Sequence, residues 1–484
     1  MINTTPQHDR VSFREKLALG VGALAAFFGY AGVSILAYPV YNMILGVSTA
    51  WIGVALMIPR IWDGLIDPIV GRMSDNCRSR FGRRKPFIFL GALVMGRLFG
   101  LIWSVPAGWS DPMKLAFFIA MQFLFFTAYV IFKVPYNALT YEMSPDYHER
   151  TRVMAFTAFF HKLGELASGW MLPFAGLLSA ALIVGAKDLN MSGIRAMGWL
   201  IGIVIMAGIG IMPGLFVRER FAHQAEKQSQ VSVWNSLKGA MKSSAFLTLV
   251  AIIVLNTLSG VLAMGIDQYV LVYFMNHGDM ATGLLQKGLL TSGYGIVGFA
   301  AIPVITWLGA KFGKSGSLYF VYGLMVIGGL AKWFIFTPGH PIIHLGKVAI
   351  DPVILLDPLL CGPMWVAVKI MLSSMMADIC DEDELKHGMR REGMFGGVFA
   401  WIEKMVLSLA YLGTGLALSL AHFDAGLGGA QAPETFTRMR LFLAGAPALT
   451  AVFALIALRF YPIDATRAAN TRRQLETRRG ALEV

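Results

Sequence analysis

One stretch decides the fold class and points to the chemistry: Arg60-Ile-Trp-Asp63-Gly-Leu-Ile-Asp67-Pro68. In a helix the two aspartates lie on one face, because they are four residues apart, and Arg60 lies one turn before Asp63. The flanking residues 51–58 and 68–70 are almost entirely apolar, which indicates a helix within a lipid bilayer. An ionised aspartate at bilayer depth costs about 2.5–3.5 kcal/mol on insertion scales, so each carboxylate needs a partner.

Two interpretations of this stretch are open. Arg60 and Asp63 can neutralise each other in a structural ion pair. Alternatively, Asp63 and Asp67 form the coupling-ion site of a transporter and bind either Na+, as metal ligands, or a proton.

Apolar runs recur throughout the 484 residues, of which 56% are hydrophobic and only 14% are charged. Soluble proteins carry about 25% charged residues, so this composition predicts a membrane protein. The net charge of +12 comes from basic residues between the apolar runs, as the positive-inside rule predicts. We therefore expect the lipid bilayer as a partner and no nucleic acid.

The apolar runs predict an all-α integral membrane protein with twelve transmembrane helices in two pseudo-symmetric six-helix bundles. The helices are expected near residues 17–45, 50–72, 86–107, 114–140, 153–184, 195–217, 244–275, 284–310, 317–337, 353–378, 393–422 and 437–460. Every second connection is rich in Lys and Arg, which predicts that both termini are cytoplasmic.

The longest polar connection, residues 218–243, divides the chain into two halves. We expect an N-terminal bundle at 1–217, a cytoplasmic loop at 218–243, a C-terminal bundle at 244–462 and a basic cytoplasmic tail at 463–484. A degenerate repeat supports this division, because a basic, glycine-containing turn follows the second helix of each half.

The first of these turns contains Gly71-x3-Asp75 and Phe81-Gly82-Arg83-Arg84-Lys85, and it resembles the loop signature of the major facilitator superfamily with a short insertion. The whole chain more narrowly resembles the glycoside–pentoside–hexuronide:cation symporter family, to which melibiose permease belongs. The resemblance rests on four patches: Arg60 to Pro68, Val134 to Leu139 with Asp146 to Arg152, Ala377–Asp378 to Glu392–Gly393, and Lys404.

The resemblance implies that Asp63 and Asp67 bind the coupling Na+, Li+ or H+, and that Lys404 lies near the cation and sugar sites. Galactoside-carrying members have acidic residues where this chain has Phe27 and Lys133, so a galactoside substrate is not expected. The residues expected to contact substrate or to carry the coupling charge are Lys133, Lys404, Asn137, Phe27, Arg60, Tyr136 and Trp365. For Trp365 the alternatives are sugar stacking and a core or interfacial position.

Lys133 leaves two possibilities for the coupling chemistry. Its ammonium group can pair with Asp63 or Asp67 and displace a metal ion, which gives a proton-coupled or uncoupled carrier. Alternatively, Lys133 and Lys404 form a basic pocket for an anionic substrate such as a hexuronide.

Charged residues at the expected cytoplasmic ends of the helices suggest a gate, with a solvated loop as the alternative. The gate residues are expected to be Asp75, Arg83, Glu142, Arg150, Asp378, Arg391 and Glu392.

These features predict a secondary active transporter that couples Na+ or H+ to symport of a sugar, glycoside or hexuronide by alternating access. A carrier of a lysolipid or other amphiphile on the same fold is the alternative. A receptor or membrane enzyme is disfavoured, because the chain has none of the hydrolase, zinc or phosphate-loop motifs that enzymes use. We expect a small-molecule substrate, and the resemblance implies that it is a carbohydrate. We also expect no cofactor beyond the coupling ion, a functional monomer and a location in a bacterial inner membrane.

Overall fold

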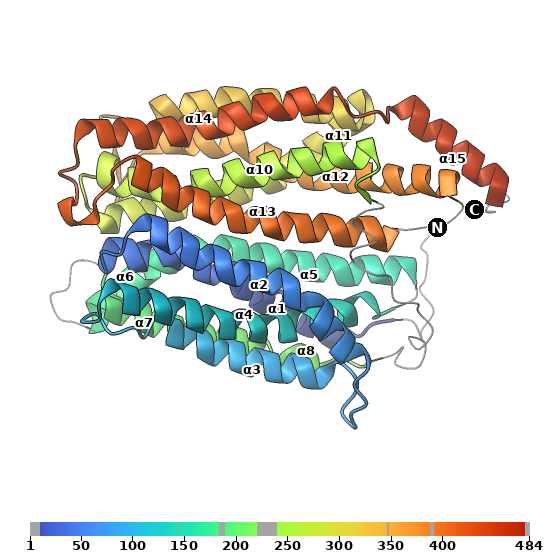
Figure 1. The fold of residues 1–484 in the computed structure, drawn as a ribbon, viewed down its shortest axis with the longest axis horizontal. Coiled ribbons are helices and arrows are strands. Elements are labelled where there is room, and N and C mark those ends of the chain that lie inside the picture. Colours follow the sequence, from blue (N-terminus) through green and yellow to red (C-terminus); the bar gives the residue numbers. More distant parts are fainter. Residues whose placement is uncertain are drawn as a thin grey trace. The chain divides into compact units, whose positions relative to one another are not determined.

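The computed structural model describes residues 10–144, 146–182, 189–219, 240–345, 348–387 and 392–479, and these are almost entirely helical (Figure 1). In chain order the elements are α1 (Phe13–Tyr38), η2 (Pro39–Ile44), α2 (Thr49–Asp75), α3 (Lys85–Ile102), α4 (Asp111–Tyr141), α5 (Tyr147–Ser168), α6 (Met171–Leu182), α7 (Met191–Leu200), η3 (Ile201–Ile209), α8 (Met212–Phe216), α10 (Ser244–Tyr269), η5 (Val270–Met275), α11 (Met280–Ile335), β1 (Ile343–Leu345), β2 (Val348–Ile350), η6 (Pro352–Leu355), α12 (Leu356–His387), α13 (Glu392–Leu420), η7 (Ala425–Leu427), α14 (Pro433–Leu458) and α15 (Ala465–Arg479).

Local sequence explains where several helices begin. Ser12 and Glu15 form a capping box at α1, in which each side chain accepts a hydrogen bond from the other residue's backbone N–H. Asp146 caps α5, because its carboxylate accepts a hydrogen bond from the Glu149 N–H at 2.8 Å. These caps satisfy N–H groups that the first helical turn leaves without intrahelical partners.

The described helices account for twelve membrane crossings. Ten are long and apolar enough to span a bilayer, and the bent pair of α5 and α6 makes eleven. The 56-residue α11 is broken at Gly313, where φ is 75°. An unbroken helix of 56 residues would be roughly 84 Å long, more than twice the hydrocarbon thickness, so the parts of α11 before and after Gly313 supply one crossing each.

One predicted helix, residues 153–184, is wrong in detail. The chain bends by 53° between α5 and α6, with the break at Gly169 and Trp170. The apolar pattern continues through the break, which explains why hydropathy alone merges the two helices.

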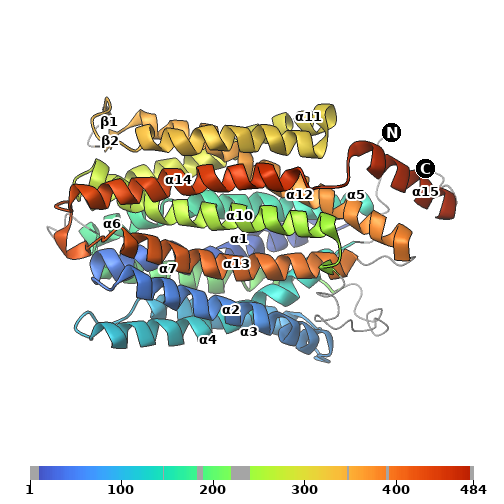
Figure 2. The same cartoon turned by 45° about the horizontal axis from the view of Figure 1, so that its top comes forward.

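The chain forms two compact units, and each is described by itself. The first consists of Met1–Gln228 with two short segments, Asp279–Gly288 and Asp424–Leu427, and the remaining residues form the second. In the first unit, α3 packs on α4 and α1 packs on α5 (Figure 2). In the second unit, α10 packs on α13 and α14.

A close helix contact in the first unit, and a hairpin and a terminal helix in the second, are further features of the fold. Gly91 lets α3 approach α4 closely, because a Cβ atom there would lie 2.5 Å from the backbone nitrogen of Phe132. In the second unit, β1 and β2 form an antiparallel hairpin with Ile343 opposite Ile350, between α11 and α12 (Figure 2). The C-terminal α15 packs on α12 and forms an ion pair between Arg467 and Glu382.

Candidate functional site

The middle of α2 carries a buried ion pair. Arg60 is 2% exposed and Asp63 is 1% exposed. The guanidinium Nη1 lies 3.3 Å from Asp63 Oδ2, and Nη2 donates a hydrogen bond to the carbonyl of Tyr30 on α1. The rings of Tyr30 and Phe126 flank the guanidinium, with centroids 4.7 and 4.4 Å from its central carbon. Arg60 is therefore held by a carboxylate, a carbonyl and two aromatic faces.

Two more predicted residues lie around the same centre. Asp67 is half-buried one helical turn beyond Asp63. On α4, the buried Tyr129 interacts electrostatically with Asp63, Arg60 and Asp67. The Lys133 ammonium lies 5.5 Å from the centroid of the Tyr129 ring. The first unit thus brings Arg60, Asp63, Asp67 and Lys133 together around Tyr129.

We call these five residues the α2–α4 cluster. Two bases, Arg60 and Lys133, and two acids, Asp63 and Asp67, give its four formally charged side chains a sum of zero. Within the described part of the chain, no three His, Cys, Asp or Glu side chains converge as a ready-made metal site. A metal ion at Asp63 and Asp67 would therefore need neutral oxygen ligands as well.

Phe27, Tyr136 and Asn137 occupy different surroundings. The ring of Phe27 is buried and packs edge-on against His161 of α5, with centroids 5.1 Å apart. Tyr136 is also buried, and its hydroxyl donates to the carbonyl of Leu19 at 2.6 Å. Both rings pack α1 against its neighbours, whereas Asn137 is half-buried. The substrate roles of these three residues stay predictions.

The second unit carries Trp365 and Lys404. Trp365 on α12 is half-buried and covers Gly260 of α10, where a Cβ atom would collide with the indole. Lys404 on α13 is half-buried, and its backbone carbonyl accepts a hydrogen bond from Ser408. The expected position of Lys404 near the cation and sugar sites stays a prediction.

A second buried ion pair, between Lys332 and Asp357, was not predicted from the sequence. The Lys332 ammonium lies 2.5 Å from Asp357 Oδ1, and the Tyr294 hydroxyl donates to Asp357 Oδ2 at 2.9 Å. Lys332 is 4% exposed and Asp357 is 0% exposed. The sequence does show that Lys332 and Asp357 are isolated charged residues within apolar runs. Because they lie 25 positions apart, no local spacing predicts that they pair.

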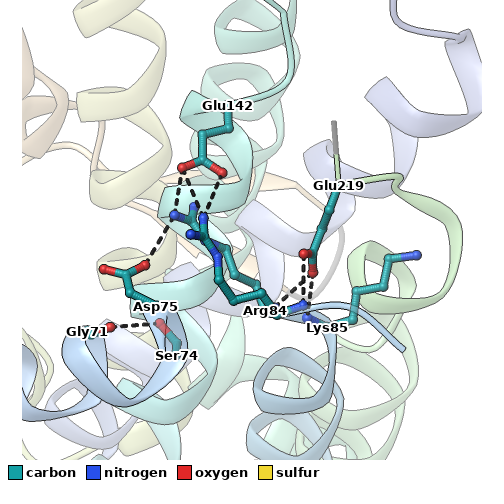
Figure 3. A network of polar contacts seen from close by, with 8 residues as sticks. Gly71, Ser74, Asp75, Arg84, Lys85, Glu142 and Glu219 are labelled. Atoms are coloured by element: carbon teal, nitrogen blue, oxygen red, sulfur yellow. Dashed lines mark hydrogen bonds and ion pairs between the residues drawn. The ribbon is translucent and has the colours of Figure 1, made fainter. Parts of the chain in front are cut away.

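At one end of the first unit, three of the predicted gate residues, Asp75, Arg83 and Glu142, form an ionic network with Arg84 (Figure 3). Arg84 Nη2 lies 2.7 Å from Glu142 and 3.3 Å from Asp75, and Arg83 Nη2 lies 3.4 Å from Glu142. Burial lowers the pKa of the Arg84 guanidinium, and the neighbouring Glu142 carboxylate opposes this shift. Glu219 also joins the network, and sequence reasoning missed it because it lies about 135 residues away along the chain.

The remaining gate residues are distributed over both units. Arg150 is exposed and donates two hydrogen bonds to the carbonyl of Ser144. In the second unit, Asp378 lies 2.6 Å from Lys314, which follows the break in α11. Arg391 lies outside the described residues, and Glu392 begins α13. A basic residue after the second span of each half thus contacts an acid near the end of the fourth. The role of these residues as a gate stays a prediction.

Comparisons with known proteins agree with this architecture. A family model described as MFS/sugar transport protein matches residues 18–465. The putative glycoside/cation symporter YagG of Escherichia coli (strain K12) is 23% identical, covering 98% of this chain and 96% of its own. The isoprimeverose transporter of Lactiplantibacillus pentosus is 22% identical, with coverage of 94% and 90%.

A relative with a different named cargo is also found. The sodium-dependent lysophosphatidylcholine symporter 1 of Mus musculus is 21% identical over 88% of this chain and 81% of its own. Among solved structures, the nucleoside transporter NupG matches with a TM-score of 0.62 at 12% identity, covering 93% of this chain and 100% of NupG. This structural likeness establishes the fold alone.

Proposed function

Because the chain belongs to the MFS/sugar transport family of the major facilitator superfamily, we propose that it is a secondary symporter in which a cation gradient drives uptake of a small carbohydrate. The observation that carries this proposal is the α2–α4 cluster, which holds two aspartates in a membrane-spanning helix beside fixed bases. Intramembrane carboxylates of this kind mark ion pathways in transport proteins.

The cluster assigns unequal parts to the two aspartates. Arg60 already compensates the charge of Asp63 at 3.3 Å, so we propose that Asp63 orients the site. Asp67 lies one turn farther along α2 and is half-buried, so we propose that it receives most of the charge of the entering Na+ or H+. Ion binding then favours the substrate-binding conformation only to the extent that the ion binds that conformation more tightly.

The cargo that we propose is a glycoside, pentoside or hexuronide. The glycoside and isoprimeverose names of two relatives, matched over nearly their full lengths, support a carbohydrate, and the hexuronide comes from the family resemblance. No cofactor beyond the coupling ion is proposed. We further propose that the carrier works as a monomer in a bacterial inner membrane, with both termini in the cytoplasm.

The charge of the α2–α4 cluster favours an anionic carbohydrate over a neutral one. The formal charges of Arg60, Lys133, Asp63 and Asp67 sum to zero, so entry of one cation alone would leave a charge of +1 within the membrane. Entry of a cation together with a uronate carboxylate would restore zero. The Lys133 ammonium, next to Tyr129, is the group that we propose faces that carboxylate.

The lysolipid alternative has one specific observation in its favour, the name of the mouse relative. Within this chain, Phe27 is an aromatic residue on α1, but its ring is buried against α5 and does not present an open apolar surface. We therefore favour the carbohydrate.

Uptake into proteoliposomes tests these proposals. The cargoes to compare are labelled isoprimeverose, a methyl glucuronide, the matching neutral methyl glucoside and lysophosphatidylcholine, each with an imposed Na+ or pH gradient. We expect a carbohydrate to be concentrated by one of the two gradients, with the glucuronide preferred over the glucoside. Equal uptake of the glucuronide and the glucoside would overturn the anionic cargo, and uptake of the lysolipid alone would overturn the carbohydrate function.

A further inference from the structure

Lys369 is a basic residue in the middle of a membrane-spanning helix. The span that contains α12 (Figure 1) runs from Pro352 to Lys386, and Lys369 is equally far from both ends. Its side chain is exposed, and its ammonium group has no ion-pair or hydrogen-bond partner among the described residues. A lysine at this depth is costly unless water or an anion compensates its charge. The charge of Lys369 is therefore available to water or to a bound anion.

Lys369 lies on a polar stripe of α12. Trp365 lies one turn before it and Ser373 one turn after it, so the three side chains share one face of the helix. Trp365 packs against Gly260 of α10 within the second unit, whereas Ser373 is exposed. A surface that faces lipid tails carries large aliphatic side chains, as Leu449 does on α14, where it is 60% exposed. The stripe has no such side chain, so it suits contact with water and a polar cargo.

The first unit repeats this arrangement on its own fourth span. Lys133 of α4 lies nine residues before Glu142, the acid that pairs with the basic turn after the second span. Lys369 lies nine residues before Asp378, which pairs with Lys314 in the corresponding position of the second unit. The two lysines are therefore equivalent positions of the two related halves.

The residues around the two lysines are also equivalent. Each lysine follows an aromatic residue by four positions and precedes a residue with a polar side chain by four, namely Tyr129 and Asn137 around Lys133, and Trp365 and Ser373 around Lys369. Because a spacing of four places side chains on one helix face, each half presents an aromatic ring, an ammonium group and a hydrogen-bonding group in the same order.

The two lysines differ in their acidic neighbours. Lys133 belongs to the α2–α4 cluster, where it and Arg60 balance the formal charges of Asp63 and Asp67. No described carboxylate lies within ion-pair distance of Lys369. Of these two equivalent lysines, Lys369 is thus the one whose charge the described protein leaves uncompensated.

We propose that Lys369 is the residue of the second unit that binds the carboxylate of an acidic sugar and selects it over the neutral sugar. The ammonium group donates hydrogen bonds to the carboxylate oxygens, and the two charges compensate each other within the membrane. A neutral sugar offers only hydroxyl groups at this position, so it leaves the charge of Lys369 in place. This inference rests on the proposed carbohydrate function and identifies a determinant of its specificity.

Uptake kinetics in proteoliposomes test this selection. Labelled methyl glucuronide gives a KM for the acidic sugar, and competition by unlabelled methyl glucoside gives the affinity for the neutral one. We expect K369M to raise the KM for the glucuronide about tenfold relative to any change in glucoside affinity, as loss of a charged hydrogen bond does. K369R keeps the charge and restores most of the preference. R97M, which removes an exposed base from α3, is the matched control and leaves the preference unchanged.

The outcomes separate this inference from the function on which it rests. If the unmodified carrier concentrates the glucuronide and K369M keeps the same preference, the inference is overturned while the carbohydrate function stands. Equal losses of affinity for both sugars in K369M would also overturn it, because they indicate a structural role. If the unmodified carrier concentrates neither sugar, the proposed function fails and the inference fails with it.

Cysteine labelling tests the position of Lys369 without any cargo. The parent chain carries Cys77→Ser, which removes the half-buried native cysteine and leaves Cys361 and Cys380, both buried. In proteoliposomes we expect K369C to react with a charged, membrane-impermeant methanethiosulfonate several-fold faster than L449C, whose side chain replaces an exposed aliphatic one. Reaction of K369C as slow as that of L449C would show that position 369 faces lipid, and this result would overturn the inference.

Discussion

Asp63→Asn tests whether the buried ion pair of α2 stabilises the folded protein. The substitution leaves the Arg60 guanidinium in its buried position, 2% exposed, without its carboxylate at 3.3 Å. Removing one member of a buried ion pair costs about 3–5 kcal/mol. Arg60 keeps the Tyr30 carbonyl and the two flanking aromatic rings, so we expect a loss near the lower end, about 3 kcal/mol.

The assay is chemical unfolding in lipid–detergent micelles, followed by tryptophan fluorescence. A loss of about 3 kcal/mol lowers the folded-to-unfolded ratio by roughly 100-fold. Glu165→Gln is the matched control, because it breaks a 2.8 Å pair with Lys162 whose side chains are 40% and 21% exposed. We expect this partly exposed pair to contribute no more than about 1 kcal/mol.

A second variant identifies the cause of the Asp63→Asn effect. Arg60→Met combined with Asp63→Asn removes both charges, so we expect it to be more stable than Asp63→Asn alone. An Asp63→Asn protein as stable as the Glu165→Gln control would refute the reasoning. A double variant that loses the sum of both single losses would also refute it.

Three further outcomes are expected in the same unfolding assay. Asp357→Asn lowers the free energy of unfolding by about 3–5 kcal/mol, because Asp357 and Lys332 form a buried pair 2.5 Å apart. Lys332→Met combined with Asp357→Asn lowers it less, and a double variant less stable than the single one would contradict this. Tyr136→Phe loses about 1 kcal/mol, because its hydroxyl donates to a carbonyl of α1; no loss would show that this hydrogen bond is unimportant. Gly91→Ala lowers the free energy of unfolding by about 1–3 kcal/mol, because the new Cβ atom would lie 2.5 Å from the α4 backbone. Gly71→Ala is the tolerated control, because the nearest atom to its Cβ would be 3.7 Å away. Equal losses in the two variants would argue against close packing as the cause.

The sequence predicted those parts of the molecule that depend on local pattern. Long apolar runs predicted the membrane spans, because a span must satisfy its backbone hydrogen bonds internally. The three-residue spacing of Arg60 and Asp63 gave their ion pair as one of two interpretations, because residues at i and i+3 are neighbours on a helix. Asp75, Arg83 and Glu142 were singled out as gate residues, but their contacts with one another and with Arg84 were not predicted.

Features that depend on tertiary contacts could not be predicted in this way. Lys332 on α11 pairs with Asp357 on α12, and the β1–β2 hairpin separates these helices along the chain. No periodic pattern therefore relates the two residues. Tyr129 was recognisable only as the residue one turn before Lys133. The bend between α5 and α6 falls within an apolar run, where hydropathy does not change.

The most direct test of the central claim compares two modes of transport by Asp67→Asn in proteoliposomes. The cargo is whichever labelled carbohydrate the unmodified carrier concentrates. We predict that Asp67→Asn still exchanges this cargo across the membrane at equilibrium but no longer concentrates it in response to a Na+ or pH gradient. Gradient-driven accumulation equal to that of the unmodified carrier would contradict the assignment of ion coupling to Asp67.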